Sequence, residues 1–142
     1  MKVTVHNAQK DLALSESSVA PIVRSVLALE KRKAESVIVY FVTKKKISAL
    51  HQEFFDDPTP TDCISFPLDE KDLGEIFVSP RAAIEYVKDS GGDVYEETTL
   101  YLVHGLLHLL GYDDLSDEEE EKMRLAEKRN LEKLKKEKKL LL

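Results

Sequence analysis

The stretch Val94–Asp114, VYEETTLYLVHGLLHLLGYDD, predicts a long helix that ends in a tight turn. Asp93 can cap the start of this helix, and Glu96, three residues later, can complete a capping box. The helix-forming run that follows is interrupted only by Gly105, until Gly111 supplies the left-handed conformation at which helices often end. We therefore expect one largely apolar helix that a glycine turn terminates.

Two histidines on this helix and an aspartate after its turn form a predicted metal site. His104 and His108 are one helical turn apart, so their side chains lie on the same face. Asp114 follows the glycine turn, where the chain can fold back toward the two imidazoles. Three protein ligands leave a fourth position open for water, as in catalytic rather than structural zinc sites. We expect one zinc ion, or another divalent metal, bound by His104, His108 and Asp114.

The same residues have two alternative interpretations. A histidine in an apolar helix is usually a core residue with a hydrogen-bond partner. Burying two imidazoles side by side without a metal would, however, leave polar atoms unsatisfied, at a cost of about 1–3 kcal/mol each. Asp113 competes with Asp114 as third ligand, although an aspartate in such a turn more often caps backbone amides.

The residue after the first histidine argues against peptide cleavage. Zinc proteases of the H-E-x-x-H type carry their general base directly after the first histidine, and this chain has Gly105 there. The order of two histidines, a glycine and a third ligand is otherwise that of the extended protease motif. This chain thus has the ligand spacing of the extended protease motif but lacks the general base of the proteases.

Three sequence blocks resemble a known family. HGLLHLLGYDD is similar to the signature H-G-x-x-H-L-x-G-Y-D-H of the YbeY family of bacterial metal-dependent endoribonucleases, also called rRNA maturation factors. Pro60–Pro67, PTDCISFP, resembles the family's P-T-D-V-L-S-F-P, and Leu73–Ile76, LGEI, resembles its L-G-D-I. The match covers nearly the whole chain. It implies a nuclease directed at single strands, which acts in 16S rRNA 3′-end maturation and ribosome quality control.

This chain departs from the family pattern at two positions. The family's third metal ligand is a histidine, whereas this chain has Asp114, an accepted zinc ligand. The family also has an arginine, thought important for activity, where this chain has Phe55. Arg81 and Lys71 are candidates for a replacement cation, and the sequence identifies no catalytic base.

Length and composition predict one globular domain. A chain of 142 residues, 42% of them hydrophobic, can bury a core of its own. Cys63 is the only cysteine, so an intrachain disulfide is excluded and a reducing compartment is expected. No segment has the length and hydropathy of a membrane span, and the start, MKVTVHNAQK, lacks the apolar region of a signal peptide. We expect a cytoplasmic protein without membrane contacts.

The net charge of −6 argues against tight, sequence-independent binding of nucleic acid. Lysines nevertheless cluster at Lys44–Lys46 and again near the C-terminus. The cluster at Lys44–Lys46 is a candidate for contacts with RNA phosphates, although a solvated helix face explains it more simply.

Periodicity predicts an α+β fold in a single domain, with a mixed four-stranded sheet surrounded by about five helices. The expected strands are Lys2–His6, Ser36–Val42, Thr61–Phe66 and Glu75–Ser79, the last two forming an antiparallel pair. Besides the metal helix, helices are expected from Ser15 or Ser18 to about Lys33, from Thr43 to Phe54 or Phe55, from Ser79-Pro80 to about Ser90, and from Ser116 toward Lys139. Thr61, Asp62 and Ser65 are expected to make turn and strand-edge hydrogen bonds, and His6 and His51 are assigned no site role.

Three function classes follow. The first is the metal-dependent endoribonuclease that the resemblance implies, with single-stranded RNA, 16S rRNA and the ribosome or small-subunit proteins as partners, and no DNA. The second is a ribosome-assembly factor that binds RNA or the ribosome, keeps a structural metal and has little catalytic activity; Phe55 favours it. The third is a metal-dependent hydrolase of another substrate, such as a peptide, which Gly105 disfavours.

Overall fold

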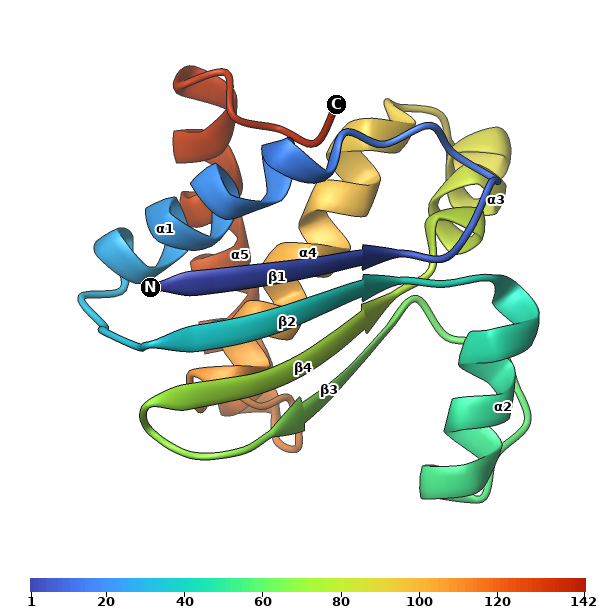
Figure 1. Ribbon diagram of the computed structural model, residues 1–142, viewed down its shortest axis with the longest axis horizontal. Coiled ribbons are helices and arrows are strands. Elements are labelled where there is room, and N and C mark those ends of the chain that lie inside the picture. The colour runs from blue at the N-terminus through green and yellow to red at the C-terminus, as the bar shows by residue number, and fades with distance from the viewer.

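A four-stranded mixed sheet forms the middle of the computed structural model, which describes residues 1–142 (Figure 1). Its strands are β1 (Lys2–Asn7), β2 (Ser36–Phe41), β3 (Cys63–Pro67) and β4 (Asp72–Val78), in the order β1-β2-β4-β3. β2 pairs in parallel with β1 and β4, whereas β3 and β4 form an antiparallel hairpin. β3 is therefore an edge strand.

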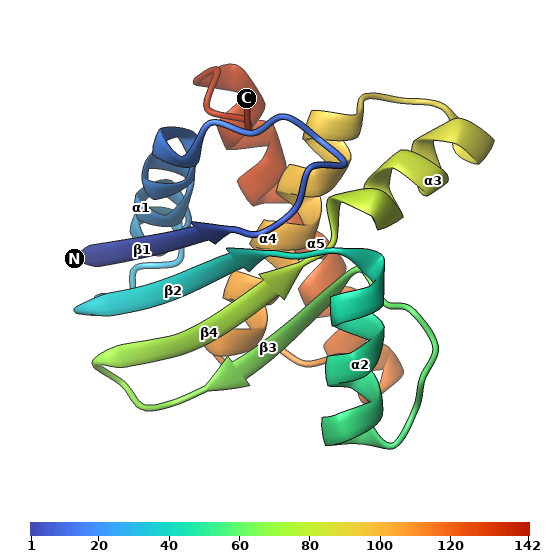
Figure 2. The ribbon, with the colours of Figure 1, turned by 45° about the vertical axis from the view of Figure 1, so that its right-hand side comes forward.

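Four of the five helices lie on one side of the sheet (Figure 2). The helices are α1 (Val19–Leu29), α2 (Lys44–Phe55), α3 (Pro80–Ser90), α4 (Val94–Leu109) and α5 (Asp117–Lys136), and a short 3-10 turn, η1 (Glu16–Ser18), precedes α1. α4 packs directly against β3 and β4, α3 lies beside α4, and α5 packs on α1 and α4. The predicted α+β architecture with a mixed four-stranded sheet and five helices is confirmed. None of these helices combines the length and the low polarity needed to cross a bilayer.

The main core lies between the sheet and α4, and it is built from alternate strand residues. Along β2, Val37, Val39 and Phe41 are buried, while the residues between them face the other side. Leu102 and Leu106 of α4 are fully buried against this surface. Burial of apolar area at about 25 cal/mol per Å² makes this contact the main stabilising term for the position of α4.

A smaller core lies under α2 on the opposite face of the sheet. It consists of Val42, Ile47, Leu50 and Ile64, with partly buried aromatic residues of the sheet packed against it. Thr43 accepts a hydrogen bond from the Lys46 N–H at 3.2 Å and so caps α2 as predicted. This small core fixes α2 beside β3.

The ends of two helices differ from the predicted ones. α1 has Ser18, the second of its two predicted caps, at its N-cap, but it stops at Leu29 rather than near Lys33, because Lys31 adopts a left-handed conformation with φ 56°. α5 stops at Lys136, and the chain then returns so that Leu141 is buried and donates its N–H to Thr99 Oγ1 at 3.0 Å. Both stops depend on tertiary contacts or on non-glycine left-handed residues, which the hydrophobic pattern does not indicate.

Candidate metal centre

α4 brings the two predicted histidine ligands together. The Nε2 atoms of His104 and His108 are 2.9 Å apart, and their ring centroids are 4.5 Å apart. Asp93 caps the start of the helix by accepting hydrogen bonds from the Tyr95 and Glu96 N–H groups. A regular helix with residues one turn apart on one face therefore accounts for the pairing.

The hydrogen-bond partners of the two rings fix which nitrogen carries the proton. The His108 Nδ1 atom lies 3.0 Å from the backbone carbonyl oxygen of Tyr112, which can only accept, so this nitrogen is protonated. The His104 Nδ1 atom is hydrogen-bonded to Glu127 Oε2. Burial raises the pKa of Glu127, but the hydrogen bonds from His104 and Arg124 outweigh it, and the pKa falls below its ordinary value. Glu127 is therefore an ionised acceptor, and His104 Nδ1 also carries its proton.

Both Nε2 atoms consequently present lone pairs to the same point. Two lone pairs facing one another at 2.9 Å repel unless a proton or a cation lies between them. Burial and the neighbouring His104 lower the pKa of His108, which disfavours the protonated ring. A bound cation would satisfy both rings, and Glu127 and the Tyr112 carbonyl orient them as second partners of metal-bound histidines commonly do.

The turn after α4 places Asp114 beside the two rings. Gly111 adopts φ 104°, and the Tyr112 N–H donates to the Leu107 carbonyl at 3.0 Å, so the chain reverses immediately after the helix. One ligand atom from each of His104, His108 and Asp114 lies within 4.8 Å of the others, close enough for the three to hold a metal ion. Asp113 instead accepts a hydrogen bond from the Leu115 N–H at 3.2 Å, the capping role expected for it.

Glu30, at the end of α1, holds this turn in place. Its carboxylate accepts hydrogen bonds from Tyr112 Oη at 2.6 Å, from Arg129 at 2.7 Å and from Asn130 at 2.8 Å. Burial opposes the charge, but the hydrogen bonds outweigh it and lower the pKa of Glu30 to about 2. We call the turn formed by residues 110–114 the ligand turn; these hydrogen bonds tie it to both α1 and α5.

Gly105 lets α4 approach the sheet. A Cβ atom at this position would lie 2.6 Å from Ile76 Cγ2 and 2.8 Å from Cys63 Sγ. Ser65 donates a hydrogen bond to the Gly105 carbonyl at 3.1 Å, so this serine ties the face of β3 to α4 rather than making the turn or strand-edge bond predicted for it. The position that holds the base of zinc proteases is therefore filled by the sheet, and a carboxylate side chain does not fit there.

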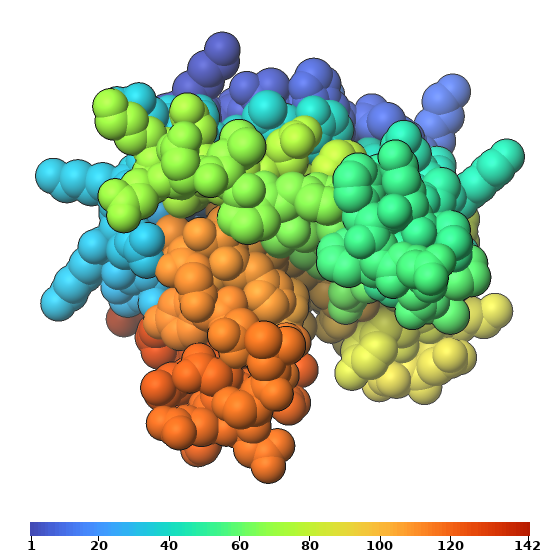
Figure 3. Space-filling view, turned by 90° about the horizontal axis from the view of Figure 1, so that it is seen from below, coloured from blue at the N-terminus to red at the C-terminus, as the bar shows by residue number.

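Two cavities meet at the histidine pair. One, of about 460 Å³, lies between α2, β3 and the ligand turn, and it is the hollow between the green and orange segments in Figure 3. We call it the α2 cleft; it is lined by His51, Phe55, Cys63, Ile64, Ser65, Pro67, His104, His108, Gly111, Tyr112 and Asp113. The other, of about 600 Å³, lies toward α3 and α5; among its lining residues are Asp62, Glu97, His104, His108, Asp114, Arg124 and Glu127. Burial raises the pKa of Cys63, which lines both cavities, so its thiol stays protonated.

The positive charge near the metal centre comes from a residue that the sequence did not indicate. Arg124 is the only lysine or arginine that lines either cavity, and its Nη1 lies 2.9 Å from Glu127 Oε1. The candidates suggested by the sequence lie elsewhere: Arg81 pairs with Asp11, and Lys71 lines a separate cavity beside Glu35. Lys44 pairs with Glu85 at 2.7 Å.

Glu127 and His51 are the other contributions that sequence reasoning missed. Glu127 lies 23 positions after His104 and reaches it only because α5 packs on α4. His51, predicted to have no site role, lines the α2 cleft, with its Nδ1 2.9 Å from the Thr59 carbonyl oxygen. His6 stacks on Tyr40 at 5.0 Å and lines neither cavity, as expected.

Comparison with known proteins assigns the family. The family model described as Endoribonuclease YbeY matches residues 4–135. The chain belongs to the YbeY family. It is 49% identical to the Endoribonuclease YbeY of Protochlamydia amoebophila, over 94% of this chain and 93% of that protein. It is 41% identical to the Chlamydia felis protein of the same name, over 92% of this chain and 89% of that one.

A solved structure supports the fold of this YbeY family member. The solution structure of TM1509 from Thermotoga maritima superposes with a TM-score of 0.70 and covers 96% of this chain and 91% of that one. The sequence identity of the pair is 24%, so the likeness speaks for the fold alone. The resemblance noted in the three sequence blocks is thus confirmed at the level of the family.

Proposed function

We propose that this protein is a metal-dependent endoribonuclease that cleaves single-stranded RNA, in the maturation of the 16S rRNA 3′ end and in ribosome quality control. The observation that carries the proposal is the convergence of the His104 and His108 lone pairs with the Asp114 carboxylate where the two cavities meet. The two nitrogen donors and one oxygen donor suit zinc, although other divalent ions accept the same set. The names of the relatives add the substrate class, RNA.

The roles of the protein groups follow from their positions. His104, His108 and Asp114 would hold the divalent ion, which when bound would supply Lewis acidity to a phosphodiester and make water a better nucleophile. Glu127 keeps the His104 proton on Nδ1 and so leaves Nε2 free as a donor. The Arg124 side chain lines the cavity that Asp114 and Glu127 also line, and it is partly exposed to solvent. Its guanidinium group can therefore pair with a phosphate oxygen.

The shape of the site favours an unpaired strand. Both histidine rings are partly buried, and the cleft beside them is bounded by α2 on one side and the ligand turn on the other. A flexible single strand can bend a phosphate into such a cleft, whereas a rigid duplex presents its backbone on a wide convex surface. We further infer that the protein acts in the cytoplasm, with the ribosome or small-subunit proteins as partners.

A second function, in ribosome assembly without cleavage, is favoured by one observation. The α2 cleft contains no lysine or arginine, and Phe55 stands where the resemblance leads one to expect an arginine. In this alternative the metal would stabilise the ligand turn, and RNA would bind without reaction.

One experiment separates the two. Zinc-loaded protein should cleave an unpaired RNA with the sequence of the 16S 3′ end and spare the same RNA annealed to a complement. His108→Ala should lose the stoichiometric metal, measured by elemental analysis, and the cleavage with it. His6→Ala, a histidine distant from both cavities, is the matched control and should retain both. RNA binding by metal-loaded protein without cleavage would instead support the assembly factor.

A further inference from the structure

Two large aromatic side chains at the end of α2 are unusually open to solvent. Phe54 is 55% exposed and Phe55 is 54% exposed. They differ in position: Phe55 lines the α2 cleft with His104 and His108, whereas Phe54 does not line it and contacts Phe66 at a centroid distance of 4.9 Å. Exposed aromatic rings at the mouth of a cleft indicate a binding surface, because folding alone gains little from leaving them there.

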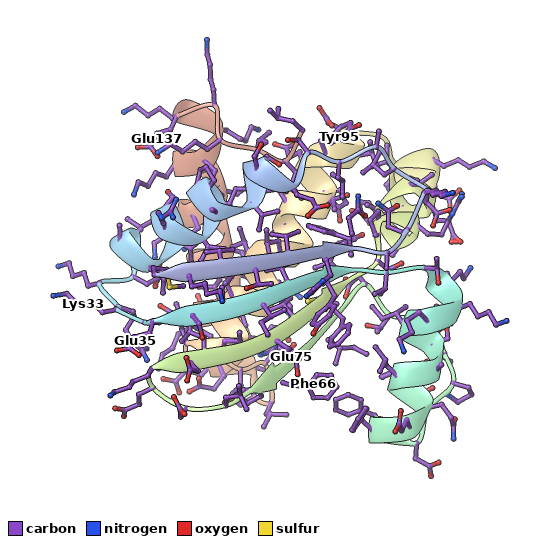
Figure 4. All side chains as sticks on the ribbon, viewed as in Figure 1. Lys33, Glu35, Phe66, Glu75, Tyr95 and Glu137 are labelled. Atoms are coloured by element: carbon purple, nitrogen blue, oxygen red, sulfur yellow. The ribbon has the colours of Figure 1, made fainter.

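The Phe55 ring is held in position by its neighbours. Its centroid is 5.4 Å from that of His51 and 6.4 Å from that of Phe66, which lies between the sheet and α2 (Figure 4). His51 is fixed in turn by the contact of its Nδ1 with the Thr59 carbonyl. The helix ends directly after Phe55, since Asp56 adopts a left-handed conformation and its N–H donates to the Gln52 carbonyl at 3.1 Å. The Phe55 ring is thus packed against His51 and Phe66 and still exposed to solvent.

We propose that Phe55, backed by His51, is a stacking subsite for an unpaired base of the RNA next to the phosphate at the His104, His108 and Asp114 cluster. The inference rests on the proposed nuclease function. Aromatic rings bind bases of any sequence through their faces, and such stacking is the usual means of holding single strands. The ring and the histidine pair share one cleft, so a strand with its phosphate at the ligands brings a neighbouring base to Phe55.

The chemistry of the cleft favours a base over other occupants. The α2 cleft has no lysine or arginine, so it suits an uncharged group such as a base rather than an acidic side chain or a lipid headgroup, and the RNA phosphate lies at the ligand cluster. Its volume of about 460 Å³ lies within the range of about 300–1,000 Å³ typical of small-ligand sites. Ser65 and Asp113, which also line it, offer oxygen atoms to the edge of a planar ring. An aromatic face with polar edge groups fits a nucleobase.

A tryptophan reporter tests the contact directly. The chain contains no tryptophan, so Phe55→Trp introduces a single fluorophore at the subsite. Titration with an unpaired RNA oligonucleotide should quench its fluorescence saturably, and an oligonucleotide with abasic sugars should quench far less. Phe54→Trp, equally exposed but outside the cleft, is the matched control and should respond weakly to both. Equal quenching by the two oligonucleotides, or none, would overturn the proposal.

Kinetics provide an independent measurement. Phe55→Ala should raise KM for unpaired RNA by about 5- to 100-fold, the usual loss when a base loses its stacking partner, with metal content unchanged. The loss should fall on KM rather than on kcat, and Phe55→Tyr should restore binding. Phe54→Ala should behave as the parent protein. An unchanged KM for Phe55→Ala would contradict the subsite.

The two proposals fail in different ways. If the metal-loaded parent protein cleaves RNA while Phe55→Trp shows no quenching and Phe55→Ala no change in KM, only the stacking subsite is wrong. If the parent protein does not cleave RNA but Phe55→Trp is quenched by base-containing RNA alone, the nuclease function is wrong and the subsite remains. The fluorescence measurement therefore does not depend on catalysis.

Discussion

At the residue scale, Asp114 is the one acidic member of the proposed ligand set, because histidines bind metals as neutral rings. Asp114→His replaces a carboxylate by a neutral imidazole and raises the net charge of the site by one. A given ion then acidifies water more strongly, and softer metals compete better. We expect the midpoint of the pH–rate profile to move to lower pH, and zinc to be retained more selectively over manganese.

The measurement for Asp114→His combines metal content after equilibration with mixed ions and the pH dependence of RNA cleavage. Asp113→Asn is the matched control, since Asp113 caps the turn through its Oδ1 and an asparagine keeps that acceptor. Identical profiles and metal content in the parent protein and Asp114→His would show that this carboxylate does not bind the ion.

The residues of the centre differ in how far the sequence could predict them. His104, His108 and Asp114 belong to one helix and its turn, so their proximity follows from local geometry. Arg124 and Glu127 join them only through the packing of α5 on α4, and no local signal links them to the histidines. Asp113 and Asp114 could be ranked by turn chemistry, whereas the placement of His51 in the cleft depends on the small core under α2.

At the scale of elements, the distance between α4 and the sheet depends on Gly105. Gly105→Ala improves helix propensity by up to about 1 kcal/mol, but the added methyl group would overlap Ile76 Cγ2 and Cys63 Sγ. Overpacking of this kind costs about 1–3 kcal/mol, so we expect a net loss of stability and displaced histidines. Urea unfolding of the parent protein and the variant measures the loss of stability. Zinc affinity reports the displacement of the histidines.

A double variant separates the overlap from other effects of Gly105→Ala. Cys63→Ala removes the sulfur atom that the new methyl group would meet at 2.8 Å. The pair Cys63→Ala and Gly105→Ala should therefore lose less stability than the sum of the two single changes. Additive losses would mean that the close approach is not what requires glycine.

Glu30 joins α1 to the ligand turn and α5, and the stability that its hydrogen bonds contribute should depend on pH. The pKa of Glu30 is lowered to about 2 from an ordinary value of 4.5. Its contribution to the free energy of unfolding is therefore fully present above about pH 4.5 and is lost as the pH falls toward 2. Glu30→Gln should reduce stability by up to about 3 kcal/mol at pH 7, and the difference from the parent protein should shrink below pH 4.5.

Unfolding in urea at neutral pH and at several acidic values measures this difference. Glu35→Gln serves as control, because Glu35 is an exposed carboxylate in the loop after α1 and outside the ligand turn. A constant difference between the parent protein and Glu30→Gln from pH 7 to pH 3 would show that the charge of Glu30 does not stabilise the turn.

Helix starts marked by a predicted capping residue were predicted closely, whereas the ends of α1 and α5 were not. α2, α3 and α4 begin within a residue of their predicted caps at Thr43, Ser79 and Asp93. The end of α1 and the final turn of α5 were placed too late, since charged helix-forming residues continue past the points where the chain turns back. Local helix propensity does not predict where these two helices end, because packing against the rest of the molecule determines it.

At the scale of the whole molecule, the net charge of −6 limits how RNA can be held. Arg124 is the only lysine or arginine that lines either cavity at the ligand cluster, and Lys45 and Lys46 lie exposed in the first turn of α2, at the other end of that helix from Phe55. The C-terminal lysines lie at the end of α5 remote from the ligand turn (Figure 1). Binding should therefore have a shallow salt dependence, with few phosphates neutralised.

The salt dependence assigns these contacts residue by residue. Each cation that neutralises a phosphate of a single strand contributes about 0.7 to the slope of log K against log salt. Arg124→Gln should reduce the slope by about 0.7, and a Lys45→Gln, Lys46→Gln double variant should flatten it further if the α2 lysines contact the strand. A Lys136→Gln, Lys138→Gln double variant has the same change in charge at the remote end and should leave the slope as it is. If the two lysine double variants change the slope equally, RNA binding depends only on the overall charge. If Arg124→Gln leaves the slope unchanged, Arg124 does not contact a phosphate.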